Sequence, residues 1–288
     1  MICRFAPSPN GLLHLGHACS ALLNWRLARA RGGVFLLRIE DIDRERSRPE
    51  FEQAMREDLG WLGLDWSRPE RRQSEFFGDY RAALEGLRAR KLVYPCFCSR
   101  GAVAASIAGK PDWPRDPDGS PLYPGLCRDM PPRLCAERIA AGERFALRLD
   151  MGRALAEVGA PLAYREFFEG DAPREMMARP ELWGDALIGR RDVPASYHLA
   201  CVHDDCVQGV TDVVRGADLE PSTGLHVLLQ RLLGFSTPDY RHHRLVLDEE
   251  GRKLSKSKGA ATLRDLHARG ASAADVVAML SGRMGFRV

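Results

Sequence analysis

Two histidines near the start of the chain, His14 and His17, have the spacing and the setting of an anion site. A short apolar run over residues 1–6 predicts a strand, and a loop rich in proline and glycine follows it. The apolar pattern from His17 to Arg31 predicts a helix, so both imidazoles should lie at its N-terminus, where backbone N–H groups attract phosphate. Gly16 would let a nucleotide approach the backbone closely. The segment predicts phosphate binding, although two ordinary surface histidines are the commoner outcome for so short a motif.

A second segment suited to phosphate chemistry lies near the other end of the chain. It runs Lys253-Leu254-Ser255-Lys256-Ser257-Lys258-Gly259 and follows a turn over residues 248–251. Flexible lysines can gather a triphosphate and stabilise the pyrophosphate that departs from it. A solvated basic loop is the alternative for any such run taken alone.

Cysteines form the third candidate site. Cys96 and Cys98 are two residues apart, and Cys127 follows in a segment rich in proline, glycine and aspartate. Thiolates at such a spacing can bind one metal ion, with a distant ligand completing a tetrahedron. Buried or free thiols are the alternative. A second set, Cys201, His203, Asp204 and Cys206, also has metal-like spacing, but its sheet-like context favours packing.

These residues need a scaffold, and the hydrophobic pattern predicts one. A strand over Val34–Ile39 and a helix from Pro49 to Leu62 extend the opening into strand–helix–strand–helix, which indicates a parallel α/β sheet. Residues 96–133 predict an insertion with little regular structure, and residues 196–209 predict a return to the sheet. Further strands are expected over 145–149 and 183–188, and helices over 222–233, 262–269 and 273–280, the second of them with a capping box of Thr262 and Asp265.

Composition limits the class of protein. The 288 residues are 45% hydrophobic and 28% charged with a net charge of +3, which fits a folded chain and permits a nucleic-acid partner without requiring one. The N-terminus lacks the pattern of a signal peptide, and no apolar stretch approaches the length of a membrane span. We therefore expect a cytoplasmic protein with no membrane partner, in which the eight cysteines are thiols or metal ligands.

Together, the histidine and lysine segments resemble the His-Ile-Gly-His and Lys-Met-Ser-Lys-Ser signatures of class I aminoacyl-tRNA synthetases. The resemblance implies a Rossmann-like parallel sheet, adenylate formation without a covalent enzyme intermediate, and Mg²⁺ accompanying ATP as a substrate. It assigns ATP binding to His14, Gly16, His17, Lys253 and Lys256. Of these, His14, His17 and Lys256 are the expected catalytic residues.

Other stretches are similar to the glutamyl/glutaminyl branch of that family. They are Arg4-Phe5-Ala6-Pro7-Ser8-Pro9, Leu37-Arg38-Ile39-Glu40-Asp41-Ile42-Asp43, Tyr197-His198-Leu199-Ala200 and Gly209-Val210-Thr211-Asp212-Val213-Val214-Arg215-Gly216. A glutamate site needs a cation for each carboxylate and an acid for the ammonium group. The resemblance implies that this site consists of Arg4, Phe5, Ala6, Pro7, Ser8, Glu40, Tyr197 and Arg215.

Within that set, Arg4 and Arg215 can supply the cations and Glu40 the acid, while Ser8 and Tyr197 complete the hydrogen bonds. The alternatives are that an arginine at a strand end pairs with a surface acid and that Glu40 faces solvent. One departure concerns the position four residues after Tyr197, where glutamyl-tRNA synthetases usually carry asparagine. The residue here is Cys201, and loss of the amide should loosen the hold on glutamate.

The cysteine array and the short C-terminal part most resemble the queuosine-modifying family, truncated relatives of glutamyl-tRNA synthetase. That resemblance implies one structural zinc ion per chain, held by Cys96, Cys98, Tyr123 and Cys127. Phenolate is a rare zinc ligand, so Cys135 or water could replace Tyr123. It also implies transfer of L-glutamate to queuosine at the anticodon wobble position of tRNA(Asp). We expect the protein to be a monomer.

The family pattern divides the chain into a first half of the catalytic domain (1–95), an insertion with the zinc site and an acceptor-binding region (96–185), a second half (186–240), and the lysine segment with C-terminal helices (241–288). About thirty residues follow Lys258, so no anticodon-binding domain is expected. The alternatives are a stand-alone glutamyl-tRNA synthetase fragment that charges the 3′ end, a non-catalytic tRNA-binding paralogue, and a small-molecule nucleotidyltransferase on the same fold. Intact His14, His17, Lys256 and Glu40 argue against a binding module.

Overall fold

The structure is a computed structural model of the 288-residue chain. It describes all residues except 168–171, 249–250, 252–253, 255–260 and 285–288. Among the described residues, no helix combines the length and the apolar character that a bilayer crossing needs.

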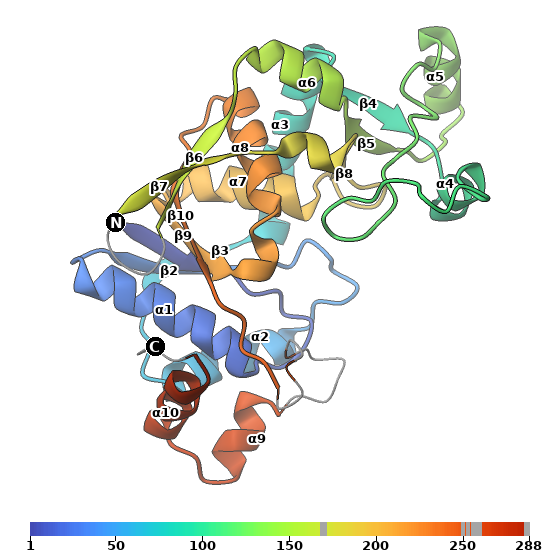
Figure 1. The fold of residues 1–288 in the computed structure, drawn as a ribbon. Coiled ribbons are helices and arrows are strands. Elements are labelled where there is room, and N and C mark those ends of the chain that lie inside the picture. The colour runs from blue at the N-terminus through green and yellow to red at the C-terminus, as the bar shows by residue number, and fades with distance from the viewer. Residues whose placement is uncertain (168–171, 249–250, 252–253, 255–260, 285–288) are drawn as a thin grey trace.

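The opening elements form the parallel sheet that the pattern predicts. Strands β1 (Ile2–Phe5), β2 (Val34–Ile39) and β3 (Ser67–Arg72) pair in that order, all parallel. Helix α1 (Leu15–Ala30) connects β1 to β2, and α2 (Pro49–Trp61) connects β2 to β3 (Figure 1). Burial of β1 and β2 on both faces explains their nearly continuous apolar sequences.

A second group of strands continues this layer. Strand β10 (Asp239–His243) pairs in parallel with β9 (Asp212–Gly216) and β6 (Ala163–Phe167), and β7 (Pro173–Met177) adds an antiparallel edge. The backbone N–H of Thr211 donates to the carbonyl oxygen of Ile2 at 3.0 Å, which sets the start of β9 beside β1. Helix α1 packs across β1, β2 and β9. The C-terminal ends of strands from both groups therefore meet at the junction of β1 and β9.

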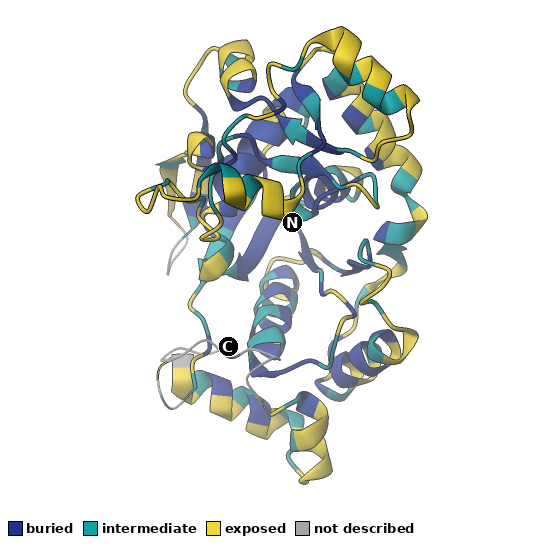
Figure 2. Cartoon of the chain, turned by 90° about the vertical axis from the view of Figure 1, so that its right-hand side faces the viewer, coloured by how far each residue is buried: buried dark blue, intermediate teal, exposed yellow. Residues whose placement is uncertain are grey.

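Helices between the strands build the second core. Helices α3 (Phe77–Ala89), α7 (Tyr197–Val207) and α8 (Ser222–Leu233) pack on one another, and α6 (Met151–Val158) packs on α8. A small antiparallel sheet of β4 (Val93–Cys96), β5 (Ala146–Leu149) and β8 (Leu187–Gly189) adjoins them. Short 3₁₀ turns cover Gln73–Glu75, Pro180–Trp183 and Ala217–Leu219. Figure 2 shows buried residues concentrated in the sheets and in the helix faces that cover them.

The insertion and the C-terminal part lie on opposite sides of the molecule (Figure 1). The insertion carries α4 (Arg100–Ser106), capped by Ser99, and α5 (Pro132–Ala140), so it has more regular structure than we predicted. Helices α9 (Leu263–Ala268) and α10 (Ala273–Met284) end the described chain, and the predicted capping box of Thr262 and Asp265 is confirmed. The backbone N–H of Leu263 donates to the carbonyl oxygen of Leu13, which brings the C-terminal helices next to the start of α1.

Two predicted elements differ from the structure. The strand expected over 183–188 is confined to Leu187–Gly189 and follows a 3₁₀ turn that ends at Trp183. Residues 196–209 form the helix α7 and the turn that follows it, instead of a strand. Ser196 caps the helix by accepting a hydrogen bond from the N–H of Leu199. Residues 199–202 are all buried because α7 is covered on several sides. The polar residues Asp204 and Asp205 of this helix are buried as well, so they mark no solvent-facing side, and a short, largely buried helix is difficult to distinguish from a buried strand.

Candidate active site

A cavity of about 530 Å³ lies at the C-terminal ends of β1, β2, β9 and β10. In open α/β sheets, ligands bind in the crevice outside the strand ends where the chain direction of the connections switches. Every described residue that we predicted to bind ATP or glutamate lines this cavity: Arg4, Phe5, Ala6, Pro7, Ser8, His14, Gly16, His17, Glu40, Tyr197 and Arg215. Lys253 and Lys256 lie outside the described residues, although Leu254, between them in sequence, also lines the cavity.

The two histidines lie at the first turn of α1. His14 is the N-cap residue, and its Nδ1 accepts a hydrogen bond from the N–H of Gly16 at 3.1 Å. The Nδ1 of His17 accepts from the N–H of His14 at 3.2 Å, and the ring centroids are 3.9 Å apart. Each neutral ring therefore carries its proton on Nε2, which makes Nε2 a donor suited to an anion.

The structure gives a reason for glycine at position 16 that we did not predict. A Cβ atom at this position would lie 2.9 Å from Cε1 of His14, a distance that real Cβ contacts essentially never show. The glycine thus makes room for the capping imidazole of His14. Its proximity to a nucleotide stays a prediction.

A buried charge network forms one wall of the cavity. Arg4 binds both carboxylate oxygens of Asp205, with Nε to Oδ1 at 2.8 Å and Nη2 to Oδ2 at 3.2 Å. Arg38, which is fully buried, donates to the same Asp205 at 2.7 Å and to Glu40 at 3.3 Å. Burial opposes ionisation of Asp205, but Arg4 and Arg38 lower its pKa to about 2. Burial raises the pKa of Glu40, although Arg38 and Arg4 oppose that shift.

This network shows which residues the sequence analysis missed. Arg38 and Asp205 received no role there, yet they connect Arg4 to Glu40. The arginine at position 38 within an otherwise apolar strand was the available signal. Because Arg4 is already paired with Asp205, a cation that is still available for an anionic ligand must come from another residue of the cavity.

Arg215, at the end of β9, is that cation. Only 4% of the residue is exposed. Its Nη2 donates to Thr223 Oγ1 at 2.8 Å, its Nε donates to His242 Nε2 at 3.3 Å, and its Nη1 lies 3.2 Å from His226 Nδ1. Burial and the charge of Arg215 place the pKa of His226 well below its ordinary value, so that ring is neutral.

No carboxylate in the described part of the chain lies within ion-pair distance of Arg215. A buried guanidinium with only neutral partners is costly unless an anion joins it. Since Arg215 lines the cavity, the geometry is that of a site for an anionic ligand group.

Two further predictions concern α7. Cys201 lines the cavity, and its Sγ lies 3.7 Å from Arg4 Nη2 and 3.8 Å from Arg38 Nη2. Burial raises the pKa of Cys201 to about 12, so it is a neutral thiol there. The carboxylate oxygens of Asp204 are already used in hydrogen bonds, because they accept from Tyr80 at 2.7 Å and from Arg71 at 2.8 Å. The packing interpretation of this second set therefore holds.

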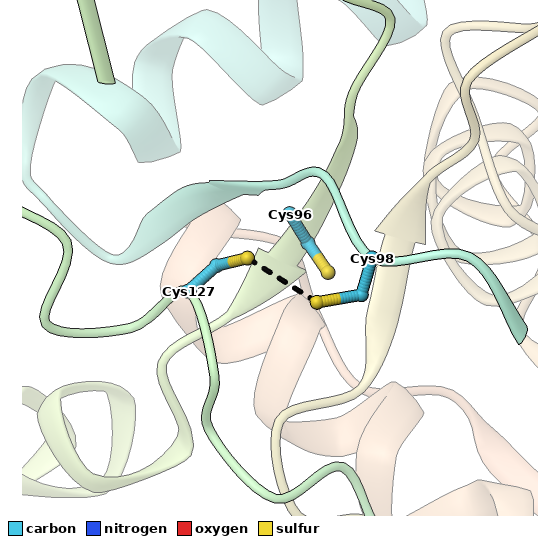
Figure 3. A group of neighbouring side chains, drawn as sticks. All are labelled: Cys96, Cys98 and Cys127. Carbon is cyan, nitrogen blue, oxygen red and sulfur yellow. Dashed lines mark hydrogen bonds between the residues drawn. The ribbon is translucent and has the colours of Figure 1, made fainter. Parts of the chain in front are cut away.

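The cysteine cluster is a compact ligand set (Figure 3). The sulfur atoms of Cys96, Cys98 and Cys127 all lie within 4.8 Å of one another, and those of Cys98 and Cys127 are 3.4 Å apart. Tetrahedral zinc with bonds of about 2.3 Å places sulfurs about 3.8 Å apart. The hydroxyl oxygen of Tyr123 is 3.4 Å from Cys98 Sγ and accepts a hydrogen bond from the N–H of Cys127. Cys135 packs against the cluster without joining the three sulfurs.

The fold is that of a class I synthetase catalytic domain, in which a parallel sheet holds the histidine segment and the cavity at its carboxyl edge. Comparison with known proteins agrees. The family model described as tRNA synthetases class I (E and Q), catalytic domain, matches residues 1–288. The chain belongs to this family.

Individual relatives narrow the similarity. The chain is 46% identical to a protein of Rhodobacter capsulatus named Glutamyl-Q tRNA(Asp) synthetase, over 96% of this chain and 98% of that one. A protein of the same name from Symbiobacterium thermophilum is 42% identical, over 98% and 86%. Among solved structures, the glutamate tRNA ligase of Elizabethkingia meningosepticum in complex with its amino acid matches with a TM-score of 0.72 and 27% identity. The match covers 94% of this chain and 53% of the ligase.

Proposed function

We propose that this protein uses ATP to activate L-glutamate and transfers the glutamyl group to queuosine at the wobble position of tRNA(Asp). The observation that carries the proposal is the 46% identity, along nearly the whole of both chains, to a protein named for that reaction. The cavity supports it independently, because the same cavity is lined by Arg215, a buried cation with no acidic partner among the described residues, and by Glu40, a buried acid.

The first step joins glutamate to AMP. A carboxylate oxygen of glutamate attacks the α-phosphorus of ATP, and pyrophosphate leaves with the electrons of the broken P–O bond. In this proposal His14 and His17 donate hydrogen bonds from the start of α1 as charge builds on the phosphate oxygens. Lys253 and Lys256 hold the leaving pyrophosphate, and Mg²⁺ accompanies the nucleotide.

Glutamate itself is held by groups of opposite charge. Arg215 pairs with a carboxylate, and Glu40, kept in place by Arg38, accepts from the ammonium group. Ser8 and Tyr197 line the same cavity and complete the hydrogen bonds. Arg4 contributes to the positive potential, although Asp205 balances most of its charge.

The second step forms an ester. A hydroxyl of the cyclopentene diol attacks the acyl carbon of glutamyl adenylate, its proton is lost, and AMP departs. Proteins read splayed nucleotides of single-stranded loops most easily, so an anticodon loop with an exposed modified base suits a cavity that is open to solvent.

The acceptor can be tested with labelled glutamate and tRNA(Asp) isolated with and without queuosine. We expect label only on the queuosine-containing tRNA. Cleavage of the product between the anticodon loop and the 3′ end should leave the label with the loop fragment. Label that leaves with the 3′ adenosine would instead identify a charging fragment of glutamyl-tRNA synthetase.

We further propose that the cysteine cluster holds one structural zinc ion, with Cys96, Cys98 and Cys127 as ligands and Tyr123 as the fourth. Three convergent thiols suit zinc, and a buried phenol at hydrogen-bond distance from Cys98 completes four positions. The ion would tie the end of β4 to the loop around residue 127 and so stabilise the insertion.

Purified protein in chelator-free buffer should contain about one zinc ion per chain. Cys98→Ser should lose most of the metal and melt at a lower temperature, whereas Cys206→Ser, at an exposed cysteine far from the cluster in sequence, should keep it. Elemental analysis of the three proteins is the measurement. Tyr123→Phe with full zinc content would show that water or another group is the fourth ligand, and wild-type protein without zinc would remove the site.

A further inference from the structure

The nearest negative charge connected to Arg215 is that of Glu166, and the side chain of His242 lies between the two. Glu166, on β6, is 2.8 Å from Nδ1 of His242 through its Oε1, and His242 is in turn the partner of Arg215 Nε. The side chains of His242 and Glu166 are only 3% and 4% exposed. The three residues thus form a buried chain of carboxylate, imidazole and guanidinium that ends at the cavity.

The hydrogen bonds that link Arg215, His242 and Glu166 all run in one direction, from the guanidinium towards the carboxylate. Glu166 is an acceptor, so Nδ1 of His242 carries the proton, and Nε2 is left as an acceptor for the N–H of Arg215. Burial lowers the pKa of His242 although Glu166 opposes that shift, so the ring is neutral. A ring with the opposite tautomer would present N–H against N–H at Arg215. Glu166 therefore fixes the tautomer of His242, in which the unprotonated Nε2 meets the guanidinium.

A comparison within the same cavity shows what this arrangement achieves. Asp205 binds Arg4 directly through two oxygens and offsets its charge, while it also pairs with Arg38. Arg215 has no direct acid among the described residues, and Glu166 compensates its charge through a neutral ring. The guanidinium keeps its ability to bind a carboxylate while its burial is still partly offset.

We propose that Glu166 is a positioning residue for substrate glutamate. Acting through His242, it orients Arg215 and balances its charge, and it leaves the guanidinium able to bind a carboxylate of the substrate. The inference rests on the proposed function, because it assigns Arg215 to a carboxylate of glutamate. It predicts that Glu166 affects the KM for glutamate without contacting glutamate or ATP.

The test is a set of variants assayed by glutamate-dependent pyrophosphate exchange. Glu166→Leu should raise the KM for glutamate about tenfold to a hundredfold, the equivalent of one hydrogen bond to a charged group, with the KM for ATP unchanged. Glu166→Gln keeps an acceptor for the Nδ1 proton and should recover much of the affinity. Glu175→Leu, on the exposed neighbouring strand β7, is the matched control and should behave as wild type.

A second variant tests the route and guards against a folding defect in Glu166→Leu. His242→Phe keeps a ring but removes the nitrogens that contact Glu166, Arg215 and Thr223, so it should raise the KM for glutamate similarly. Adding Glu166→Leu to it should then have no further effect, since residues that act through one contact are not additive.

Three results would overturn the inference: an unchanged KM for glutamate in the folded variants, an equal rise in the KM for ATP, or additive effects in the double variant. A wild-type protein with no glutamate-dependent exchange would instead reject the proposed function.

Discussion

Replacing Arg215 with alanine is expected to raise the KM for glutamate at least about thirtyfold, because removing one partner of a buried charge pair typically costs about 2–5 kcal/mol. Only 4% of Arg215 is exposed, and its guanidinium has three neutral partners. In the variant, a carboxylate of glutamate would enter a buried cavity and find Thr223, His226 and His242 in place of a cation. Glutamate titrations in the pyrophosphate exchange assay measure the effect.

The variant also needs a control for folding and for charge. Arg231→Ala removes an exposed arginine from the end of α8 and should leave the KM for glutamate unchanged. Arg215→Lys keeps the charge but loses the fork of donors, so it should lie between wild type and alanine. Glutamine should be a poor substrate of the wild type, since a neutral amide forms no ion pair. Unchanged glutamate affinity in a folded Arg215→Ala protein would place carboxylate recognition elsewhere.

Much of the scaffold could be predicted from the sequence because its signals are local. The strand and helix periods of residues 1–62 have clear boundaries in proline and glycine, and the structure confirms β1, α1, β2 and α2 in that order. The capping box of Thr262 is likewise a relation between residues three apart. Where neighbours in sequence decide the conformation, the pattern was sufficient.

The residues behind the cavity wall could not be found in this way. Arg38 and Asp205 are 167 positions apart, and His242 and Glu166 are 76 apart. Their partnership exists only once β2, β6, β10 and α7 are assembled. Helix α7 failed for a related reason, since burial on several sides removes the polar face that marks a surface helix. The residues that line the cavity were predicted from the resemblance to the synthetase family, and the roles that we assign to them are proposals.

The lysine segment carries the other large expected effect. Lys256→Ala should lower the rate of glutamate-dependent pyrophosphate exchange by about 10²–10³, the usual result of removing one preorganised group that stabilises charge in the transition state. Its KM for glutamate should change little, because Arg215 and Glu40 remain in place. A defect confined to turnover would separate the phosphate end of the site from its amino-acid end.

The alternative for this segment is a basic loop in which any lysine serves equally, and a neighbouring residue distinguishes the two. Lys258→Ala removes the same charge two positions further on. If Lys256 holds the departing pyrophosphate, only Lys256→Ala should slow exchange, whereas equal losses in both variants would indicate general attraction of ATP. In the specific case, transfer of glutamate from preformed glutamyl adenylate to tRNA should proceed normally in Lys256→Ala, since pyrophosphate has already left. Full exchange activity in Lys256→Ala would refute the assigned role.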